Sequence, residues 1–173
     1  MTSGTAYAFR FDGTEWIEEQ KFTASDAAEK DQFGVSVSVL GDVIAIGAFS
    51  NDEAAPNSGA AYVFRFNGTE WIEEQKLMAS DAAARDEHGL SVAVSGDVIV
   101  VGAPGNRSYS GSAYIYRFNG TDWSEDHKLA ALDGVDRDSL GESLAVSGDV
   151  IVVGADGNDE AGENSGAAYV FEI

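Results

Sequence analysis

Side chains that could bind a metal ion are concentrated in one short segment, Asp-Gly-Asn-Asp-Glu, from residue 156 to residue 160. Carboxylate and amide oxygens are the ligands that Ca²⁺ prefers, and here they occupy positions 1, 3, 4 and 5 of a loop. The candidate ligands are Asp156, Asn158, Asp159 and Glu160. Ala161 stands where a calcium loop has glycine, and no glutamate occupies position 12. The segment is a candidate Ca²⁺ site with an incomplete pattern, and a solvated acidic loop is the alternative.

A second candidate site lies at residues 104–109, Pro-Gly-Asn-Arg-Ser-Tyr, a segment with a net positive charge in an acidic protein. Arginine and tyrosine are enriched among the residues that dominate binding energy at interfaces. We therefore predict that Arg107 and Tyr109 bind a ligand, a protein or a glycan whose identity the sequence does not indicate. Neutral variation in a surface loop is the alternative.

Motifs for catalysis are not recognisable in the sequence. His88 and His127 are single histidines in different sequence contexts, and no nucleophile elbow, phosphate-binding loop or zinc-ligand spacing occurs. Cysteine is absent, which excludes disulfides and thiol catalysis. We predict that the protein is not an enzyme.

The charge of the chain limits its partners. Its 173 residues include 30 acidic and 10 basic residues, a net charge of −20. A surface this acidic repels nucleic acid and anionic lipid and attracts cations or basic partners, and it also favours solubility or adaptation to high salt. No apolar run approaches about 18 residues and no basic-plus-apolar leader is recognisable, so we expect no membrane span.

The elements that must position these residues follow from an internal repeat. The run Phe9–Lys21, FRFDGTEWIEEQK, returns at Phe64–Lys76 with one change and, more loosely, at Tyr116–Lys128. Self-similarity at such a period indicates stacked supersecondary units that cannot bury their apolar faces alone.

Each repeat contains the pattern of four strands. A strand of small residues, a Gly-Asp turn and a continuous β-branched run predict an antiparallel hairpin, and a later Asn-Gly between two strand patterns predicts another. The last strand is charged, as expected for a solvent-facing edge that must resist aggregation. Small residues first, apolar residues next and charged residues last is the radial order of a propeller blade.

These repeats resemble the FG-GAP repeat of integrin α-subunit β-propellers and their microbial relatives. The name-giving elements appear as Phe33-Gly34 with Gly47-Ala48, and less completely as His88-Gly89 with Gly102-Ala103-Pro104 and as Leu140-Gly141 with Gly154-Ala155. The resemblance implies an all-β fold, a β-propeller built of four-stranded antiparallel meander blades with about three repeats per chain. We expect a single array over residues 1–173, with a half blade at 3–24, blades at 34–77 and 89–129, and a partial blade at 141–173.

One departure from the family pattern affects metal binding. Integrin-type repeats have a calcium loop between the first two strands, and here that connection is only a Gly-Asp turn, too short to supply six oxygens. Each blade has tight turns at one end and long loops at the other, and these loops carry more than half of the net negative charge. The loop-rich end is therefore the expected recognition surface.

The resemblance and the missing catalytic motifs together predict a non-catalytic recognition or adhesion module, extracellular or on the cell surface. The alternatives are a purely structural repeat segment of a larger surface protein, or a propeller hydrolase. Because the first and last repeats hold complementary parts of a blade, we also expect a homodimer that forms a six-bladed ring.

Overall fold

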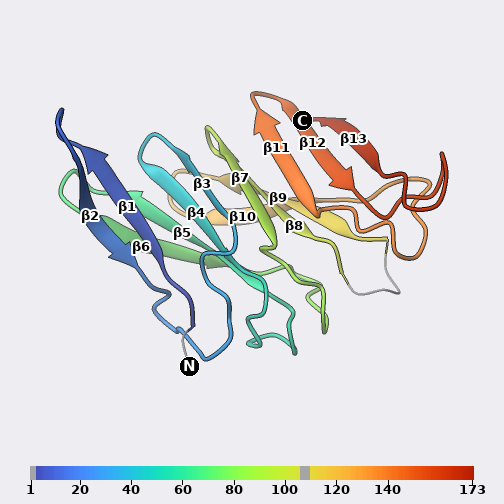
Figure 1. The fold of residues 1–173 in the computed structure, drawn as a ribbon, viewed down its shortest axis with the longest axis horizontal. Coiled ribbons are helices and arrows are strands. Elements are labelled where there is room, and N and C mark those ends of the chain that lie inside the picture. The colour runs from blue at the N-terminus through green and yellow to red at the C-terminus, as the bar shows by residue number, and fades with distance from the viewer. Residues whose placement is uncertain (1–2, 106–109) are drawn as a thin grey trace.

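The computed structural model describes residues 3–105 and 110–173, and every regular element in this part of the chain is a β-strand. The strands form four separate antiparallel sheets that lie side by side in chain order (Figure 1). They are β1 (Ala6–Phe11), β2 (Trp16–Phe22), β3 (Val37–Leu40), β4 (Val43–Ala48), β5 (Ala60–Phe66), β6 (Trp71–Leu77), β7 (Ser91–Ser95), β8 (Val98–Ala103), β9 (Ser112–Phe118), β10 (Trp123–Leu129), β11 (Ser143–Ser147), β12 (Val150–Ala155) and β13 (Ala167–Glu172).

The predicted meander blades are confirmed. The two complete sheets have the orders β3-β4-β5-β6 and β7-β8-β9-β10, and the outer sheets are the pair β1-β2 and the three strands β11-β12-β13. The Gly-Asp turns are two-residue hairpins, as between Leu40 and Val43, and Gly41 has a φ of 60°, which suits the first central position of a type II′ turn. The Asn-Gly hairpins have four-residue loops, because the Asn67 side chain accepts hydrogen bonds from the backbone N–H groups of Thr69 and Glu70.

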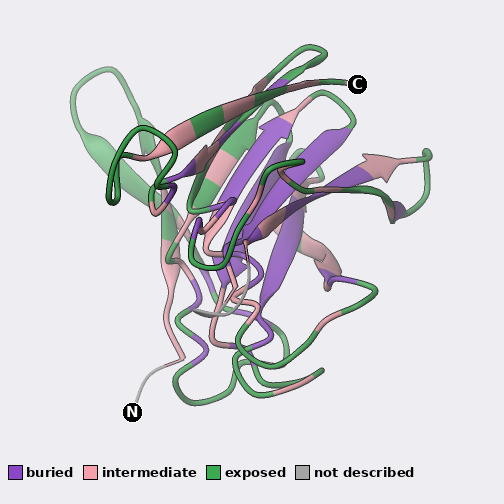
Figure 2. Ribbon diagram, turned by 90° about the vertical axis from the view of Figure 1, so that its right-hand side faces the viewer, coloured by how far each residue is buried: buried purple, intermediate pink, exposed green. Residues whose placement is uncertain are grey.

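The core lies between the sheets, on their second and third strands. All six residues of β4 and all six of β8 are buried, as are the first five of β5 (Figure 2). Small residues are needed where neighbouring sheets meet: a Cβ atom added to Gly47 would lie 1.9 Å from the Gly89 carbonyl oxygen, and one added to Gly102 would lie 2.1 Å from that of Gly141. Any side chain there would push two sheets apart.

A β-bulge interrupts each of the pairs β1-β2, β5-β6 and β9-β10, and β1 and β2 correspond to the two outer strands of a complete sheet. The pairing skips one acidic residue, Glu19 in β2, Glu74 in β6 and Asp126 in β10. The skipped carboxylate contacts an arginine of the neighbouring strand, as in the 2.7 Å contact between Glu74 and Arg65 and the 2.7 Å contact between Asp126 and Arg117. The bulge therefore turns the side chain of one acidic residue in each charged strand toward the arginine of the neighbouring strand.

The sheets fan out as successive blades of a propeller arc (Figure 1). The inner strands β3, β7 and β11 are neighbours, and one hydrophobic cluster joins the two complete sheets. In the described ranges, no helix is long and apolar enough to cross a membrane.

Candidate ligand-binding site at the loop-rich end

A lysine ammonium group occupies a cage of oxygen atoms between the first two sheets. Lys76 of β6 donates to Asp26 Oδ2 at 2.6 Å and to Asn51 Oδ1 at 3.2 Å, and it also contacts Glu53. The Tyr62 ring lies beneath the ammonium, which is 5.3 Å from the ring centroid, and the Tyr62 hydroxyl donates to Asp26 Oδ1 at 2.7 Å. Three segments build this ammonium cage: the loop that leaves β2, the loop between β4 and β5, and the β5-β6 hairpin.

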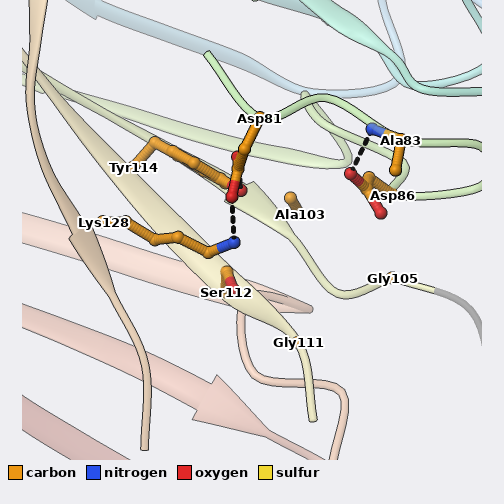
Figure 3. A pocket seen from close by; sticks show the side chains of 9 residues that line it. All are labelled: Asp81, Ala83, Asp86, Ala103, Gly105, Gly111, Ser112, Tyr114 and Lys128. Atoms are coloured by element: carbon orange, nitrogen blue, oxygen red, sulfur yellow. Dashed lines mark hydrogen bonds and ion pairs between the residues drawn. The ribbon is translucent and has the colours of Figure 1, made fainter. Parts of the chain in front are cut away.

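The same cage recurs at the next junction between sheets. Lys128 donates to Asp81 Oδ2 at 2.7 Å, its ammonium lies 5.1 Å from the centroid of the Tyr114 ring, and the Tyr114 hydroxyl donates to Asp81 Oδ1 at 2.7 Å (Figure 3). The loop between β8 and β9 is three residues shorter than its counterpart between β4 and β5. A cavity of about 250 Å³ lies beside this second cage, with Asp86, Gly105 and Gly111 in its wall.

The cavity combines fixed donors and acceptors. Hydrogen bonds from Lys128 hold the pKa of Asp81 below its usual value, while burial and the bond to Asp81 raise the pKa of Tyr114. Asp86 accepts a hydrogen bond from the Ala83 backbone N–H at 2.7 Å. Asp81 and Tyr114 therefore keep their charge states near neutral pH, which suits binding of a polar ligand better than proton transfer.

An aspartate lies two residues before each Phe-Gly motif or its equivalent, and its side chain closes the loop that links two sheets. Asp31, Asp86 and Asp138 each accept a backbone N–H bond from three residues earlier. The basic residue before each of them has positive φ: Lys30, Arg85 and Arg137 have values of 76°, 69° and 80°. These aspartates therefore have a structural role, because each ties together the loop that links two sheets.

The four predicted calcium ligands do not converge. Asn158 is buried and donates to Asp138 at 3.2 Å, and Asp159 accepts the Asn164 backbone N–H at 2.6 Å. Asp156 and Glu160 are exposed. Among the residues that the structure describes, no three His, Cys, Asp or Glu side chains are grouped to hold a metal ion, so the geometry gives the predicted Ca²⁺ site no support.

The other predicted site, Arg107 and Tyr109, lies outside the described residues, and only the flanks of its loop, Gly105 and Gly111, are placed. Sequence reasoning missed the cages themselves. The signal was present, because a tyrosine, a lysine and an aspartate recur at constant spacing as Tyr62, Lys76 and Asp81 and again as Tyr114, Lys128 and Asp133.

One of the two histidines packs against the second cage, since the ring centroids of His88 and Tyr114 are 5.2 Å apart. His88 is fully buried, its Nε2 lies 3.1 Å from the Tyr116 hydroxyl, and burial lowers its pKa to about 3. His127 is exposed on β10 next to Asp126. His88 is therefore a neutral core residue at ordinary pH.

Comparison with known proteins agrees with the repeats in the structure. A family model described as the FG-GAP repeat matches the chain three times, over residues 16–64, 71–116 and 123–171. Each match runs from the fourth strand of one sheet to the third strand of the next. No individual curated protein matches the chain.

Proposed function

The chain belongs to the FG-GAP repeat family, and on this premise we propose that it is a non-catalytic recognition or adhesion module displayed outside the cell or on its surface. The observation that carries the proposal is the cavity beside Asp81, Tyr114 and Lys128. It lies at the loop-rich end, where a scaffold of rigid strands presents variable loops to a ligand.

The chemistry of this cavity supports binding. Its described wall has an ammonium, carboxylates and a tyrosine hydroxyl held by mutual hydrogen bonds, as in sites that fix the orientation of a polar ligand. The pKa of Asp81 is lowered by its hydrogen bond from Lys128, the pKa of Tyr114 is raised by burial and its bond to Asp81, and His88 is buried in the core. A protein or glycan with several hydroxyl, amide or basic groups is the ligand class that such a wall accommodates.

A glycan and protein array tests this function. We expect specific binding by the whole chain, and we expect the double change Arg107→Ala with Tyr109→Ala to remove it, because both residues belong to the loop beside the cavity. The matched control is Asp97→Ala, an exposed change in a tight turn at the opposite end of the sheet. Binding that survives the double change would contradict the proposed site.

A purely structural segment is the second candidate, and one observation favours it. Lys76 and Lys128 are held by aspartates of the loops that link successive sheets, so the cages also fasten these loops to the sheets. An array with no specific signal would favour this role. Turnover in a broad panel of esterase, phosphatase and glycosidase substrates would instead contradict the non-catalytic proposal.

A further inference from the structure

The first ammonium cage is closed by a carboxylate of its own loop. An ammonium group has three N–H donors, and Lys76 directs them at oxygens of Asp26, Asn51 and Glu53. Glu53 belongs to the loop between β4 and β5, and the side chain of Lys76 is only 15% exposed. The first cage therefore sets two carboxylates against one ammonium and satisfies that ammonium within the protein.

The second cage lacks the carboxylate of the loop. In the described parts of the chain, Lys128 forms its one ion pair with Asp81, at 2.7 Å. The loop between β8 and β9, residues 104–111, contains no aspartate or glutamate, so it cannot supply the group that Glu53 supplies to the first cage. The place of that carboxylate beside Lys128 is therefore not filled by an acid of this chain.

The cavity beside Lys128 has the size and the polar groups to take a small ligand. Its volume of about 250 Å³ is below the range of about 300–1,000 Å³ of pockets for drug-sized ligands, so it suits one ring rather than a long chain. Figure 3 shows the Lys128 ammonium and the Ser112 side chain on one side of this space and the Asp86 carboxylate across from them. A ligand carboxylate would meet the ammonium, and ligand hydroxyl groups would meet the oxygens of Ser112 and Asp86.

The charge of the short loop favours an anion at this place in an acidic protein. Residues 49–59, between β4 and β5, have a net charge of −2, whereas residues 104–111 have a net charge of +1. Most of the total charge of −20 lies elsewhere along the chain, and salt at physiological concentration screens exposed charges beyond about 8 Å. Of the two cages, the second is therefore the one where an added carboxylate meets less repulsion.

We propose that this cavity binds a sugar acid, whose carboxylate accepts hydrogen bonds from Lys128 in the place that Glu53 takes in the first cage. The inference rests on the proposed recognition role and deepens it by naming the class of ligand. A hydrogen bond between an ammonium and a carboxylate is charge-assisted and is about twice as strong as a neutral one. A single sugar ring also presents several hydroxyl groups to the opposite wall.

Matched monosaccharides test the inference by NMR titration of the whole chain at neutral pH. Methyl glucuronide and methyl glucoside differ only in the exocyclic group, which is a carboxylate in the first and a hydroxymethyl group in the second. We expect the glucuronide to bind about tenfold more tightly, because only its carboxylate can pair with the Lys128 ammonium. Equal binding of the two sugars, or binding of neither, would overturn the inference.

Matched variants identify the group that binds the carboxylate. Lys128→Gln removes the ammonium and should reduce binding of the glucuronide to the level of the glucoside. Lys21→Gln makes the same change at the corresponding position of β2, in another sheet, and should keep the tenfold preference. Thermal melts establish that both variants fold. A preference that survives Lys128→Gln would contradict the assigned contact.

The NMR signals of the wild type give a second test that needs no variant. The backbone amide signals of Gly111 and Ser112, which line the cavity, should shift when the glucuronide is added. Those of Gly59 and Ala60, their counterparts beside the first cage, should stay in place because Glu53 already occupies that position. Shifts at both cages alike, or at neither, would also overturn the inference.

Other outcomes separate this inference from the proposed function. Tighter binding of N-acetylglutamate amide than of the glucuronide would assign the carboxylate to a protein side chain and overturn the sugar acid. A neutral glycan that binds on the array and is lost with Arg107→Ala and Tyr109→Ala, without a preference for the glucuronide, would support the recognition role and overturn this inference alone. An array without specific binding would instead contradict the recognition role.

Discussion

At the scale of residues, a lysine occupies the position that a metal ion holds in many acidic loops. Lys76 is surrounded by oxygens from Asp26, Asn51 and Glu53, and its side chain is only 15% exposed. The spacing of these residue types was visible in the sequence, but their meeting was not, because they come from three separate segments of the chain. The acidic segment at 156–160 suggested calcium for the same reason: sequence composition shows which oxygens are present but not where they point.

One residue-scale difference among the repeats predicts a pH effect. His88 stands where the other repeats have Phe33 and Leu140, and folding lowers its pKa to about 3 from an unfolded value of 6.5. Below pH 6.5 the unfolded chain binds a proton that the folded protein does not. The free energy of unfolding therefore falls as the pH falls, by up to about 1.4 kcal/mol per pH unit, until the pH reaches the folded pKa.

The double change His88→Phe with Tyr116→Phe tests this effect. It reproduces the aromatic pair Phe33 and Phe64 of the preceding junction, whose ring centroids are 6.2 Å apart, and it leaves no hydroxyl without a partner. Urea denaturation between about pH 7 and pH 5 should show a shallower loss of stability than in the wild type. His127→Ala, a change at an exposed histidine, should keep the wild-type slope. Parallel curves for the double variant and the wild type would show that His88 does not titrate on unfolding.

At the scale of elements, the strands and hairpins could be predicted because their periodicity and turn residues are local signals. The role of the charged fourth strand could not. It was interpreted as an edge that resists aggregation, yet Glu73 binds Ser25 of the preceding loop and Gln75 binds the backbone of Trp123 in the next sheet. The bulge at Glu74, which the sequence pattern does not reveal, sets the register of these contacts.

The link between Gln75 and Trp123 gives the element-scale prediction. Gln75 donates to the Trp123 carbonyl at 2.7 Å and accepts from its backbone N–H at 2.7 Å. Gln75→Ala removes both bonds from a partly buried site, so the free energy of unfolding should fall by about 1–3 kcal/mol. Gln75→Glu should be no less costly than Gln75→Ala, because a carboxylate oxygen would then face the Trp123 carbonyl oxygen at a partly buried site. Chemical denaturation measures both, and Glu70→Ala, an exposed change, should alter stability by less than about 0.5 kcal/mol. A Gln75→Ala protein as stable as Glu70→Ala would show that this link does not hold the sheets together.

At the scale of the whole molecule, the repeats predicted the order of strands and sheets but not the closure of the ring. Closure depends on how the first and last sheets meet, which no local pattern encodes. Beside the pair β1-β2, a groove of about 370 Å³ lies over the face of β3 and β4, with Val37 and Val39 in its wall, and both valines are more than half exposed. The corresponding face of the next sheet, at β7, is covered by β3 and β4, the two inner strands of the preceding sheet.

The last prediction is that a second copy covers this groove. Strands β11 and β12 of the second copy have the sequence of inner strands. They would pair with the edge of β1 in the first copy once β13 of the second copy moves aside. This arrangement keeps the Arg10–Glu19 pair of β1 and β2 and avoids placing Glu19 opposite Glu172. Light scattering should therefore give a dimer, twice the chain mass of 18.2 kDa. The double change Val37→Asp with Val39→Asp should return it to a monomer, because it would bury two unpaired charges. Val170→Asp, on the displaced strand, should leave the dimer intact. A wild-type protein that runs as a uniform monomer would rule out the six-bladed ring.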